Sequence, residues 1–367
     1  MKILQVIDSL RIGGSESLAA SLAEQFSKRG VESHICAMGV DGPLRERLDK
    51  AGITATHLNA PQGIKPGAMF SLGRLALRHR CNVILTHHFR QLVHAIPAAA
   101  LLRRRLVHVE HDYHSYEQRP DILRHFALLA PFVHKFVFVS EEIRDWFAQR
   151  LPQAAAKCVS IPNGIDTDRF MRHEEARISL RNRLGAQENT VIVGTCARLE
   201  PIKDLGLLIQ GFSLMVKALG QAGEDAKLVL VGDGSQREHL EQLAKTLGVA
   251  DKCHFAGMVN DVHNWLSAFD IYAITSIDEG LPLSVMEAMS ASLPVVSVNV
   301  GSISSIIDDS LGVLLDSRDH ETLGKIFFEL YMDQKSTHAK GLKARVKIKE
   351  KYSATVMAKK YLHIIIM

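Results

Sequence analysis

The chain has 367 residues, of which 47% are hydrophobic and 23% are charged. These proportions exclude disordered and fibrous classes, and the length suits two domains of about 100–200 residues each. Residues 1–165 contain 21 Lys and Arg against 14 Asp and Glu, whereas the remainder contains 23 against 26. The basic first half favours an anionic partner, such as an acidic lipid surface or a phosphorylated acceptor. Scattered solvated charges explain the excess more simply, except at the cluster Arg103, Arg104 and Arg105.

Apolar runs alternate with amphipathic stretches along the first half. Strands are expected at residues 3–7, 34–38, 83–86, 106–110 and 136–139. A helix is expected from about Ser15 to Arg29, because Leu18, Leu22 and Phe26 recur at four-residue spacing. The first apolar run is too short and interrupted for a signal peptide.

The same alternation restarts in the second half. Strands are expected at residues 190–196, 227–231, 252–256, 271–274 and 294–298, and a helix at 203–219. Alternating strands and helices imply parallel sheets covered on both faces, so we predict an α/β protein of two Rossmann-like, doubly wound domains. Pro162 and Asn163-Gly164 mark the boundary. The expected domains are 1–165 and 166–350, followed by a C-terminal helix over 351–367.

The expected cellular location rests on two features that the sequence lacks, a membrane-spanning run and paired cysteines. No apolar run reaches the ~18–20 residues that a membrane span needs. The five cysteines are scattered without a C-x-x-C pair, which is typical of a reduced cytosolic protein. We therefore expect a soluble, cytoplasmic protein that at most attaches peripherally to a membrane face.

Loops that follow strands are the places to look for a binding site, because ligands of open α/β sheets bind at the carboxyl ends of strands. Two such sheets facing one another would leave a deep cleft. Gly13 and Gly14 follow the first strand and open a helix, where glycine lets the backbone approach a phosphate or sugar. A plain tight turn explains the pair about equally well.

A second loop contains two cations. Arg198 and Lys203 follow the strand that ends near Cys196. They could hold one anionic group, with arginine as a fork and lysine as a point charge. An ordinary surface pair is the alternative.

The segment Glu279 to Glu287 is the most informative. Pro282 suits a first helical turn, which leaves the N–H groups of Leu283 and Ser284 available to a diphosphate. The two glutamates could instead be a hydrolase pair, but eight residues of continuous helix would separate them by ~12 Å. Glycosidase carboxyls need about 5–9.5 Å. Two separate hydrogen-bonding roles toward sugar hydroxyls are more natural.

Histidines cluster near the ends of two first-half strands. His108, His111 and His114 recur at three-residue spacing, which could indicate a metal. Strand alternation instead puts His108 and His111 on opposite faces, so we expect no metal and choose His111 as the candidate. His87 and His88 also lie at a strand end and could line the same cleft, but we interpret them as core or rim residues.

Taken together, these segments resemble the family 4 glycosyltransferases of GT-B fold (glycosyltransferase group 1), the large retaining group. The resemblance covers nearly the whole chain, and the ordered set is highly specific. The matching stretches are Gly13–Glu16, His111-Asp112, Val139-Ser140, 161–166, 194–203, 231–234 and the E-x7-E motif at 279–287.

The resemblance implies a role for each candidate. The first domain would bind the acceptor and the second the nucleotide sugar, and the C-terminal helix would cross back onto the first domain. Neither metal nor cofactor would be needed besides the donor. Arg198 and Lys203 would hold the donor diphosphate, and Glu287 would hold the ribose. Glu279 and His111 would meet the transferred sugar, and Gly14 the diphosphate or the acceptor. The segment from Phe255 to Val259, which includes Met258, would frame the base, largely through its backbone.

One segment departs from the family pattern. Where relatives often have Gly-Gly-x-Pro-Glu, this chain has Gly301-Ser302-Ile303-Ser304-Ser305.

The expected activity is retaining transfer from a nucleoside-diphosphate sugar, with UDP favoured and GDP next. The acceptor would be a sugar, a lipid-linked sugar or a polysaccharide in bacterial polysaccharide, lipopolysaccharide or glycolipid assembly, with no nucleic acid involved. A nucleotide-sugar epimerase and a non-catalytic nucleotide-binding partner subunit are the alternatives.

Overall fold

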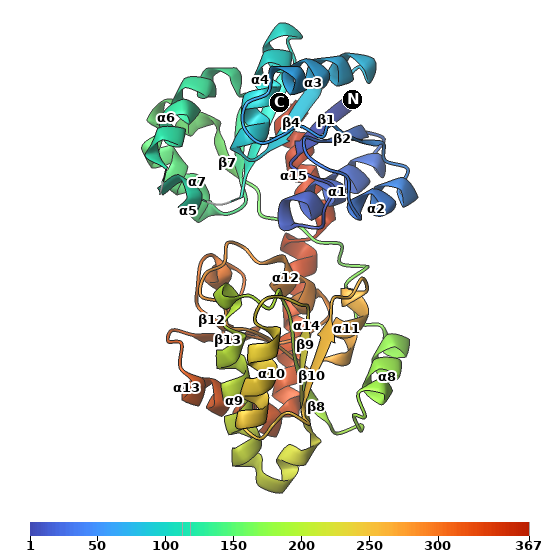
Figure 1. Ribbon diagram of the computed structural model, residues 1–367, viewed down its shortest axis with the longest axis vertical. Helices are drawn as coiled ribbons and strands as arrows, with labels where there is room; N and C mark the ends of the chain where they lie inside the picture. The colour runs from blue at the N-terminus through green and yellow to red at the C-terminus, as the bar shows by residue number, and fades with distance from the viewer. Residues whose placement is uncertain (112, 118, 367) are drawn as a thin grey trace. The chain divides into compact units, whose positions relative to one another are not determined.

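A computed structural model describes residues 1–111, 113–117 and 119–366, apart from the side chains at 114, 115, 120 and 222. The chain divides into two compact units (Figure 1). The first comprises residues 1–165 with 353–367, and the second comprises 166–352. Each unit contains one parallel sheet, so the predicted two-sheet α/β fold is confirmed.

The sheet of the first unit has seven parallel strands in the order β3-β2-β1-β4-β5-β6-β7. Two three-residue strands, β3 and β7, were not expected, because they are too short to show an apolar run. The strands are β1 Lys2–Ile7, β2 Glu32–Ala37, β3 Ala55–His57, β4 Val83–His87, β5 Arg105–Glu110, β6 Lys135–Phe138 and β7 Cys158–Ser160.

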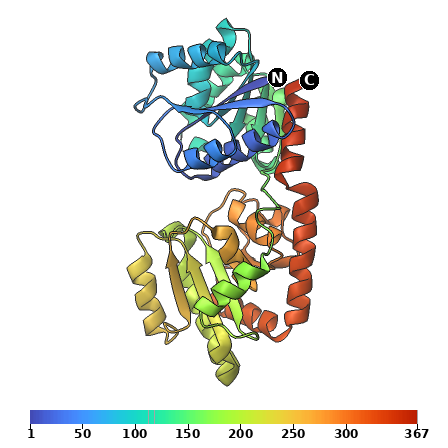
Figure 2. The ribbon, with the colours of Figure 1, turned by 90° about the vertical axis from the view of Figure 1, so that its right-hand side faces the viewer.

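Helices cover this sheet, and the last helix of the chain is one of them. Helix α15 (Ala354–Ile366) packs against α1 (Gly14–Ser27), and Figure 2 shows it beside the first sheet. The Arg105 guanidinium donates to the carbonyl of Ile366 at 2.9 Å, and Tyr361 is buried in the core. The other helices are α2 Leu44–Lys50, α3 Pro66–Arg78, α4 Phe89–Leu101, α5 His114–Glu117, α6 Pro120–Leu129, η1 Ala130–Phe132, α7 Glu141–Arg150 and η2 Pro152–Lys157.

The sheet of the second unit has six parallel strands in the order β10-β9-β8-β11-β12-β13. Its strands are β8 Val191–Cys196, β9 Ala226–Val231, β10 Cys253–Gly257, β11 Ile271–Ile274, β12 Val295–Val298 and β13 Gly312–Leu315. Its helices are α8 Glu174–Arg183, η3 Pro201–Lys203, α9 Leu205–Leu219, η4 Gly220–Asp225, α10 Arg237–Thr246, α11 Val262–Ala268, α12 Leu283–Ser290, η5 Ile303–Ser305, α13 His320–Met332 and α14 Gln334–Lys351.

The helix predicted to start at Lys203 is wrong at its beginning. Lys203 ends the 3-10 helix η3, and Asp204 has a left-handed backbone (φ 41°, ψ 50°) before α9 starts. The Asp204 carboxylate pairs with Arg318, and the Thr275 hydroxyl donates to the Asp204 carbonyl at 2.9 Å. These long-range contacts stabilise the left-handed residue that separates η3 from α9, and helical periodicity in the sequence cannot reveal such a break.

In each sheet the strand order reverses beside a central strand. The reversal lies between β1 and β4 in the first sheet, and between β8 and β11 in the second. Ligands of open α/β sheets bind at such points, outside the carboxyl ends of the strands. No helix in the described part of the chain is long and apolar enough to cross a bilayer.

Candidate functional site

In the second unit, the loops after β8 and β11 meet at an ion pair. Lys203 Nζ lies 2.5 Å from Glu279 Oε1, and the Ser276 hydroxyl donates to the same oxygen at 2.6 Å. The side chains of Lys203 and Glu279 are 19% and 11% exposed, so the pair is largely shielded from water. Sequence reasoning gave the two residues separate roles and missed this pairing.

The backbone of these loops is fixed by bonds between them. The Thr275 hydroxyl donates to the carbonyls of Lys203 and Asp204, at 3.2 and 2.9 Å. The Ile277 N–H donates to the Ile202 carbonyl at 2.8 Å. Lys203 is therefore positioned by the end of β11, although it follows β8 in the chain.

Tyr272, buried in β11, ties the end of β8 to the start of α12. Its hydroxyl donates to the Cys196 carbonyl at 3.3 Å and hydrogen-bonds Ser284. Burial raises the pKa of Tyr272, and its neighbours Cys196 and Glu287 act in the same direction. The phenol therefore stays protonated as a hydrogen-bond donor.

Helix α12 begins at Leu283 without a side-chain cap and without an acidic residue in its first turn. Its first N–H groups therefore have no partner within the helix, and its positive dipole end is not neutralised locally. Leu283 and Ser284 are half-buried, and Glu287 lies about one turn further along the helix, also half-buried. Glu279 lies in the loop before this helix. This end of α12 suits an anion.

Arg198 is exposed just beyond β8. Within the described residues, its guanidinium makes no hydrogen bond or ion pair with the protein. Its neighbours are fixed, since the N–H groups of Ala197 and Leu199 donate to the carbonyls of Val231 and Asp233, both at 3.0 Å. The backbone is anchored while the guanidinium remains available to a ligand.

The loop that departs from the family pattern supports the Glu279 loop through its backbone. Gly301 has φ +53°, and a Cβ there would stand 1.6 Å from the Glu279 carbonyl oxygen. The Ser302 N–H donates to the Gly280 carbonyl at 3.2 Å. Ser304 and Ser305 are exposed, so the substituted positions lie outside this contact.

The segment expected near the base follows β10. Gly257 has φ +73°, and its carbonyl accepts from the Gly232 N–H at 2.9 Å. Met258 is 81% exposed and Val259 is half-buried. An exposed, flexible apolar side chain at this strand end suits contact with the face of a base.

In the first unit, Gly13 caps α1 and Gly14 is its first residue. Neither has a positive φ, so turn geometry does not demand glycine. A Cβ on Gly13 would stand 2.4 Å from the Glu16 carboxylate, whereas no described atom lies within 4 Å of a Cβ on Gly14. Gly14 therefore leaves open space above the helix start.

The histidines at the ends of β4 and β5 form a network that sequence reasoning missed. His87 Nδ1 lies 3.2 Å from His111 Nε2. The buried Glu110 carboxylate accepts from the His111 N–H at 3.0 Å and lies 3.4 Å from both His88 Nδ1 and His108 Nε2. The signal was present in the sequence, because β4 and β5 are consecutive strands and both end in histidine-rich segments.

Burial decides the charges in this network. It lowers the pKa of His87 to about 3 and that of His111 well below its usual range. Burial alone would raise the pKa of Glu110, but the hydrogen bonds and charges of His108 and His88 outweigh it and hold that pKa well below its usual range. The network therefore presents neutral His87 and His111 rings around a buried carboxylate.

The histidine segment can be followed only in part. Asp112, half of the expected His111-Asp112 pair, lies outside the described residues, as does the side chain of His114. Among the residues that are described, no group of three or more His, Cys, Asp or Glu is placed to hold a metal ion.

Two family models match consecutive parts of the chain. The model of the glycosyl transferases group 1 matches residues 176–347, and that of glycosyltransferase family 4 matches residues 12–169. A GDP-mannose-dependent alpha-(1-6)-phosphatidylinositol monomannoside mannosyltransferase of Mycolicibacterium smegmatis is 29% identical over 218 residues, which are 57% of this chain and 56% of the relative. The chain thus spans about half the length of that relative. The O-antigen biosynthesis glycosyltransferase WclY of Escherichia coli is 22% identical over 87% of this chain and 80% of its own.

Solved structures share the architecture of the whole chain. HepE of Anabaena, in complex with UDP, superposes with a TM-score of 0.84 at 23% identity, covering 99% of both chains. WaaG, a glycosyltransferase involved in lipopolysaccharide biosynthesis, gives 0.72 at 17% identity, also covering 99% of both. At these identities the likeness shows the fold alone. With both family models and this fold, the chain belongs to family 4 of the glycosyltransferases and has the GT-B fold.

Proposed function

We propose that the protein transfers a sugar from a nucleoside-diphosphate sugar to an acceptor hydroxyl, with retention at the anomeric carbon. The observation that carries the proposal is the convergence of Lys203, Glu279 and the uncapped start of α12 at the carboxyl ends of β8 and β11. Arg198 leaves the same edge of the sheet, and its guanidinium has no hydrogen-bond or ion-pair partner among the described residues.

Sugar transfer requires that the departing nucleoside diphosphate, an anion, be stabilised. As the bond between the anomeric carbon and the diphosphate breaks, negative charge grows on the diphosphate. Arg198, Lys203 and the N–H groups of Leu283 and Ser284 supply fixed donors for that charge. Because these groups take the charge-neutralising role, we propose that neither metal nor cofactor is required.

Donor binding would rearrange the Lys203–Glu279 pair. Lys203 Nζ has three donors, so it can hold the carboxylate and a phosphate oxygen together. Glu279 Oε1 already accepts from Lys203 and Ser276, which leaves Oε2 for a sugar hydroxyl. Glu287 would take the ribose hydroxyls, Met258 and Val259 the base, and Gly14 the diphosphate or the acceptor. His111 is proposed to meet the transferred sugar as a neutral ring.

The names of relatives support a class of substrates. The mycobacterial relative is named for GDP-mannose and a phosphatidylinositol mannoside, and HepE was solved with UDP. We propose a UDP-sugar first and a GDP-sugar next as donor. The acceptor would be a sugar, lipid-linked sugar or polysaccharide in bacterial envelope assembly, met in the cytoplasm or at the cytoplasmic membrane face.

A turnover assay tests the proposal against both alternatives. UDP- and GDP-sugars are incubated with the protein and lipid or saccharide acceptors, and nucleoside diphosphate release and product are measured. Acceptor-dependent release, lost in Lys203→Ala and kept in the exposed control Lys245→Ala, is expected. Conversion of donor alone would indicate an epimerase, and nucleotide binding without release would indicate a partner subunit.

A further inference from the structure

The basic excess of residues 1–165 is concentrated in one segment. Residues 50–109 contain nine Lys and Arg and no Asp or Glu. The remainder of residues 1–165 contains 12 basic and 14 acidic residues, so the whole excess comes from this segment. It comprises β3, α3, β4, α4 and all of β5 except its last residue.

Helices α3 and α4 lie side by side and end at the same edge. A Cβ on Gly73 of α3 would touch the Ala98 Cβ of α4 at 3.8 Å. Each helix leads into a strand of one parallel sheet, so the two run in the same direction. Leu77 lies one turn beyond Gly73, and Leu101 nearly one turn beyond Ala98. Figures 1 and 2 show the two helices next to each other.

The outer face of α3 is apolar, although its inner face already supplies the core. Ala68, Leu72 and Ala76 are buried. Phe70 and Leu77, on the opposite side, are 70% and 54% exposed, and Leu101 at the end of α4 is 83% exposed. Nothing in the packing of this unit requires three large apolar side chains there.

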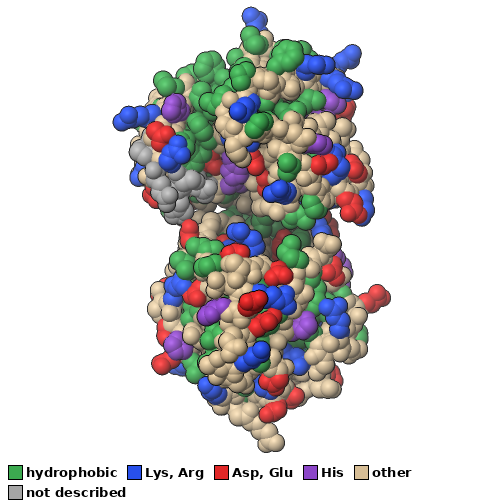
Figure 3. All heavy atoms as spheres, viewed as in Figure 1, with side chains coloured by type: hydrophobic (Ala, Val, Ile, Leu, Met, Phe, Trp, Pro, Cys, Tyr) green, Lys and Arg blue, Asp and Glu red, His purple; other side chains and the backbone are tan. Residues whose placement is uncertain are grey.

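Arginines stand among these apolar side chains. Arg74, Arg78 and Arg103 are exposed, and in the described part of the chain their guanidinium groups have no hydrogen-bond or ion-pair partner. With Phe70, Leu77 and Leu101 they form what we name the α3–α4 surface. Figure 3 shows hydrophobic and basic side chains gathered over these helices.

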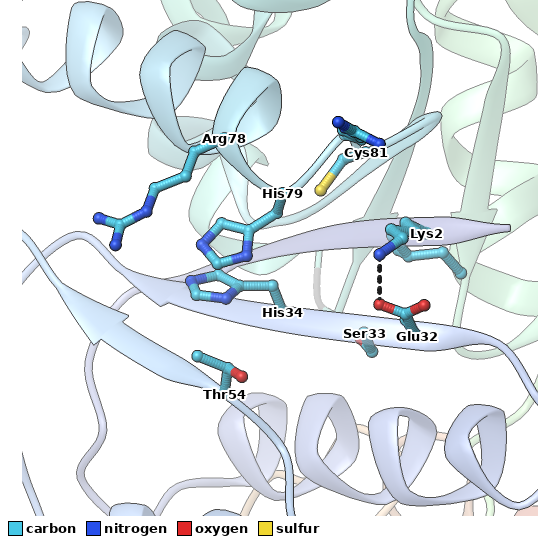
Figure 4. A pocket seen from close by; sticks show the side chains of 10 residues that line it. Lys2, Glu32, Ser33, His34, Thr54, Arg78, His79 and Cys81 are labelled. Carbon is cyan, nitrogen blue, oxygen red and sulfur yellow. Dashed lines mark hydrogen bonds and ion pairs between the residues drawn. The ribbon is translucent and has the colours of Figure 1, made fainter.

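The basic character continues into a neighbouring pocket. A pocket of about 360 Å³ is lined by Lys2, Arg78, His79 and Arg80, among others (Figure 4). Lys2 is paired with Glu32 at 2.6 Å, whereas Arg78 and Arg80 have no such partner among the described residues. The pocket is large enough for a phosphate-bearing headgroup beside the apolar side chains.

We propose that the α3–α4 surface docks the protein on an anionic lipid bilayer. Phe70, Leu77 and Leu101 would enter the boundary between headgroups and acyl chains, while the arginines contact lipid phosphates. A soluble acidic protein would match the charge but not the isolated, widely exposed apolar side chains. The inference does not rest on the proposed function. Helices α3 and α4 end at the amino edge of the sheet, opposite the carboxyl ends of β4 and β5, so the contact would hold the protein at the bilayer without placing the histidine network against it.

Vesicle binding tests the docking without donor or acceptor, so it can fail independently of the transfer reaction. The full chain is co-sedimented with vesicles of phosphatidylcholine alone or mixed equally with phosphatidylglycerol. Binding to the anionic vesicles only, weakened by salt, is expected. Arg74→Gln with Arg78→Gln should lower the affinity about 30-fold, and Phe70→Ser with Leu77→Ser should lower it at least tenfold.

Matched controls lie in the second unit. Ile178→Ser replaces an apolar residue of 61% exposure, and Lys335→Gln with Lys349→Gln removes two exposed cations. All variants change exposed residues, so their thermal melting should match that of the unchanged protein. Equal binding to both vesicle types, unchanged binding of the α3–α4 variants, or binding to polyaspartate but not to vesicles would overturn the proposal.

Discussion

Lys203→Ala tests how the anion site is built. The substitution removes one charge-assisted contact to the diphosphate, which is worth about 1.5–3 kcal/mol. It also leaves the Glu279 carboxylate, 11% exposed, with the Ser276 hydroxyl as its remaining donor among the described residues and without the cation that offsets its repulsion of the diphosphate. Affinity for the nucleoside diphosphate should therefore fall roughly 10- to 150-fold or more.

A double-mutant cycle separates the two effects. Glu279→Gln keeps the shape of the side chain and removes the charge, so adding it to Lys203→Ala should recover part of the lost affinity while transfer stays abolished. Affinities are measured by calorimetry for all four proteins, with Lys245→Ala as control. Losses that simply add, or undiminished affinity in Lys203→Ala, would refute the shared site, because residues in contact are expected to be coupled.

Three further predictions concern the supports of the site. Gly301→Ala should displace the Glu279 loop, because its Cβ would stand 1.6 Å from the Glu279 carbonyl oxygen; a lower melting temperature and weaker nucleotide binding are expected, and neutrality would count against the contact. Gly14→Ala meets no described atom, so stability should stay within about 0.5 kcal/mol while turnover falls; unchanged turnover would support the plain-turn interpretation. His87 has a folded pKa of about 3 against 6.5 when unfolded, so the unfolded chain binds more protons and stability is lost as pH falls below about 6.5. By pH 5 this costs up to about 2 kcal/mol, and His87→Gln should reduce the difference in melting temperature between pH 7 and pH 5; an unchanged difference would contradict a neutral, buried ring.

The fold was predictable for most strands that are apolar and at least four residues long. Residues 271–274 were predicted as a strand, and β11 has these bounds. The three-residue strands β3 and β7 were missed, as was β13 over Gly312–Leu315, because a short edge strand shows no distinctive periodicity. The break at Asp204 was missed because Thr275 and Arg318, both far away in sequence, hold it.

The site was predictable as a set of residues but not as an arrangement. Lys203 and Glu279 are 76 residues apart, and they meet because β8 lies beside β11 in the sheet. No sequence motif indicates that these two strands are neighbours in the sheet. The network of His87, Glu110 and His111 depends in the same way on β4 lying beside β5. The roles proposed for these residues remain predictions.

The second unit's capacity to hold a nucleoside diphosphate is the centre of this account. The most direct measurement is the thermal shift of the protein and of Lys203→Ala with UDP, GDP, ADP, TDP and CMP, each with and without EDTA. A ligand that binds only the native state raises the melting temperature by mass action. We predict a clear rise with one diphosphate, UDP first and GDP next, that EDTA leaves unchanged and Lys203→Ala largely removes. No rise with any nucleotide, or a rise that Lys203→Ala retains in full, would contradict the account.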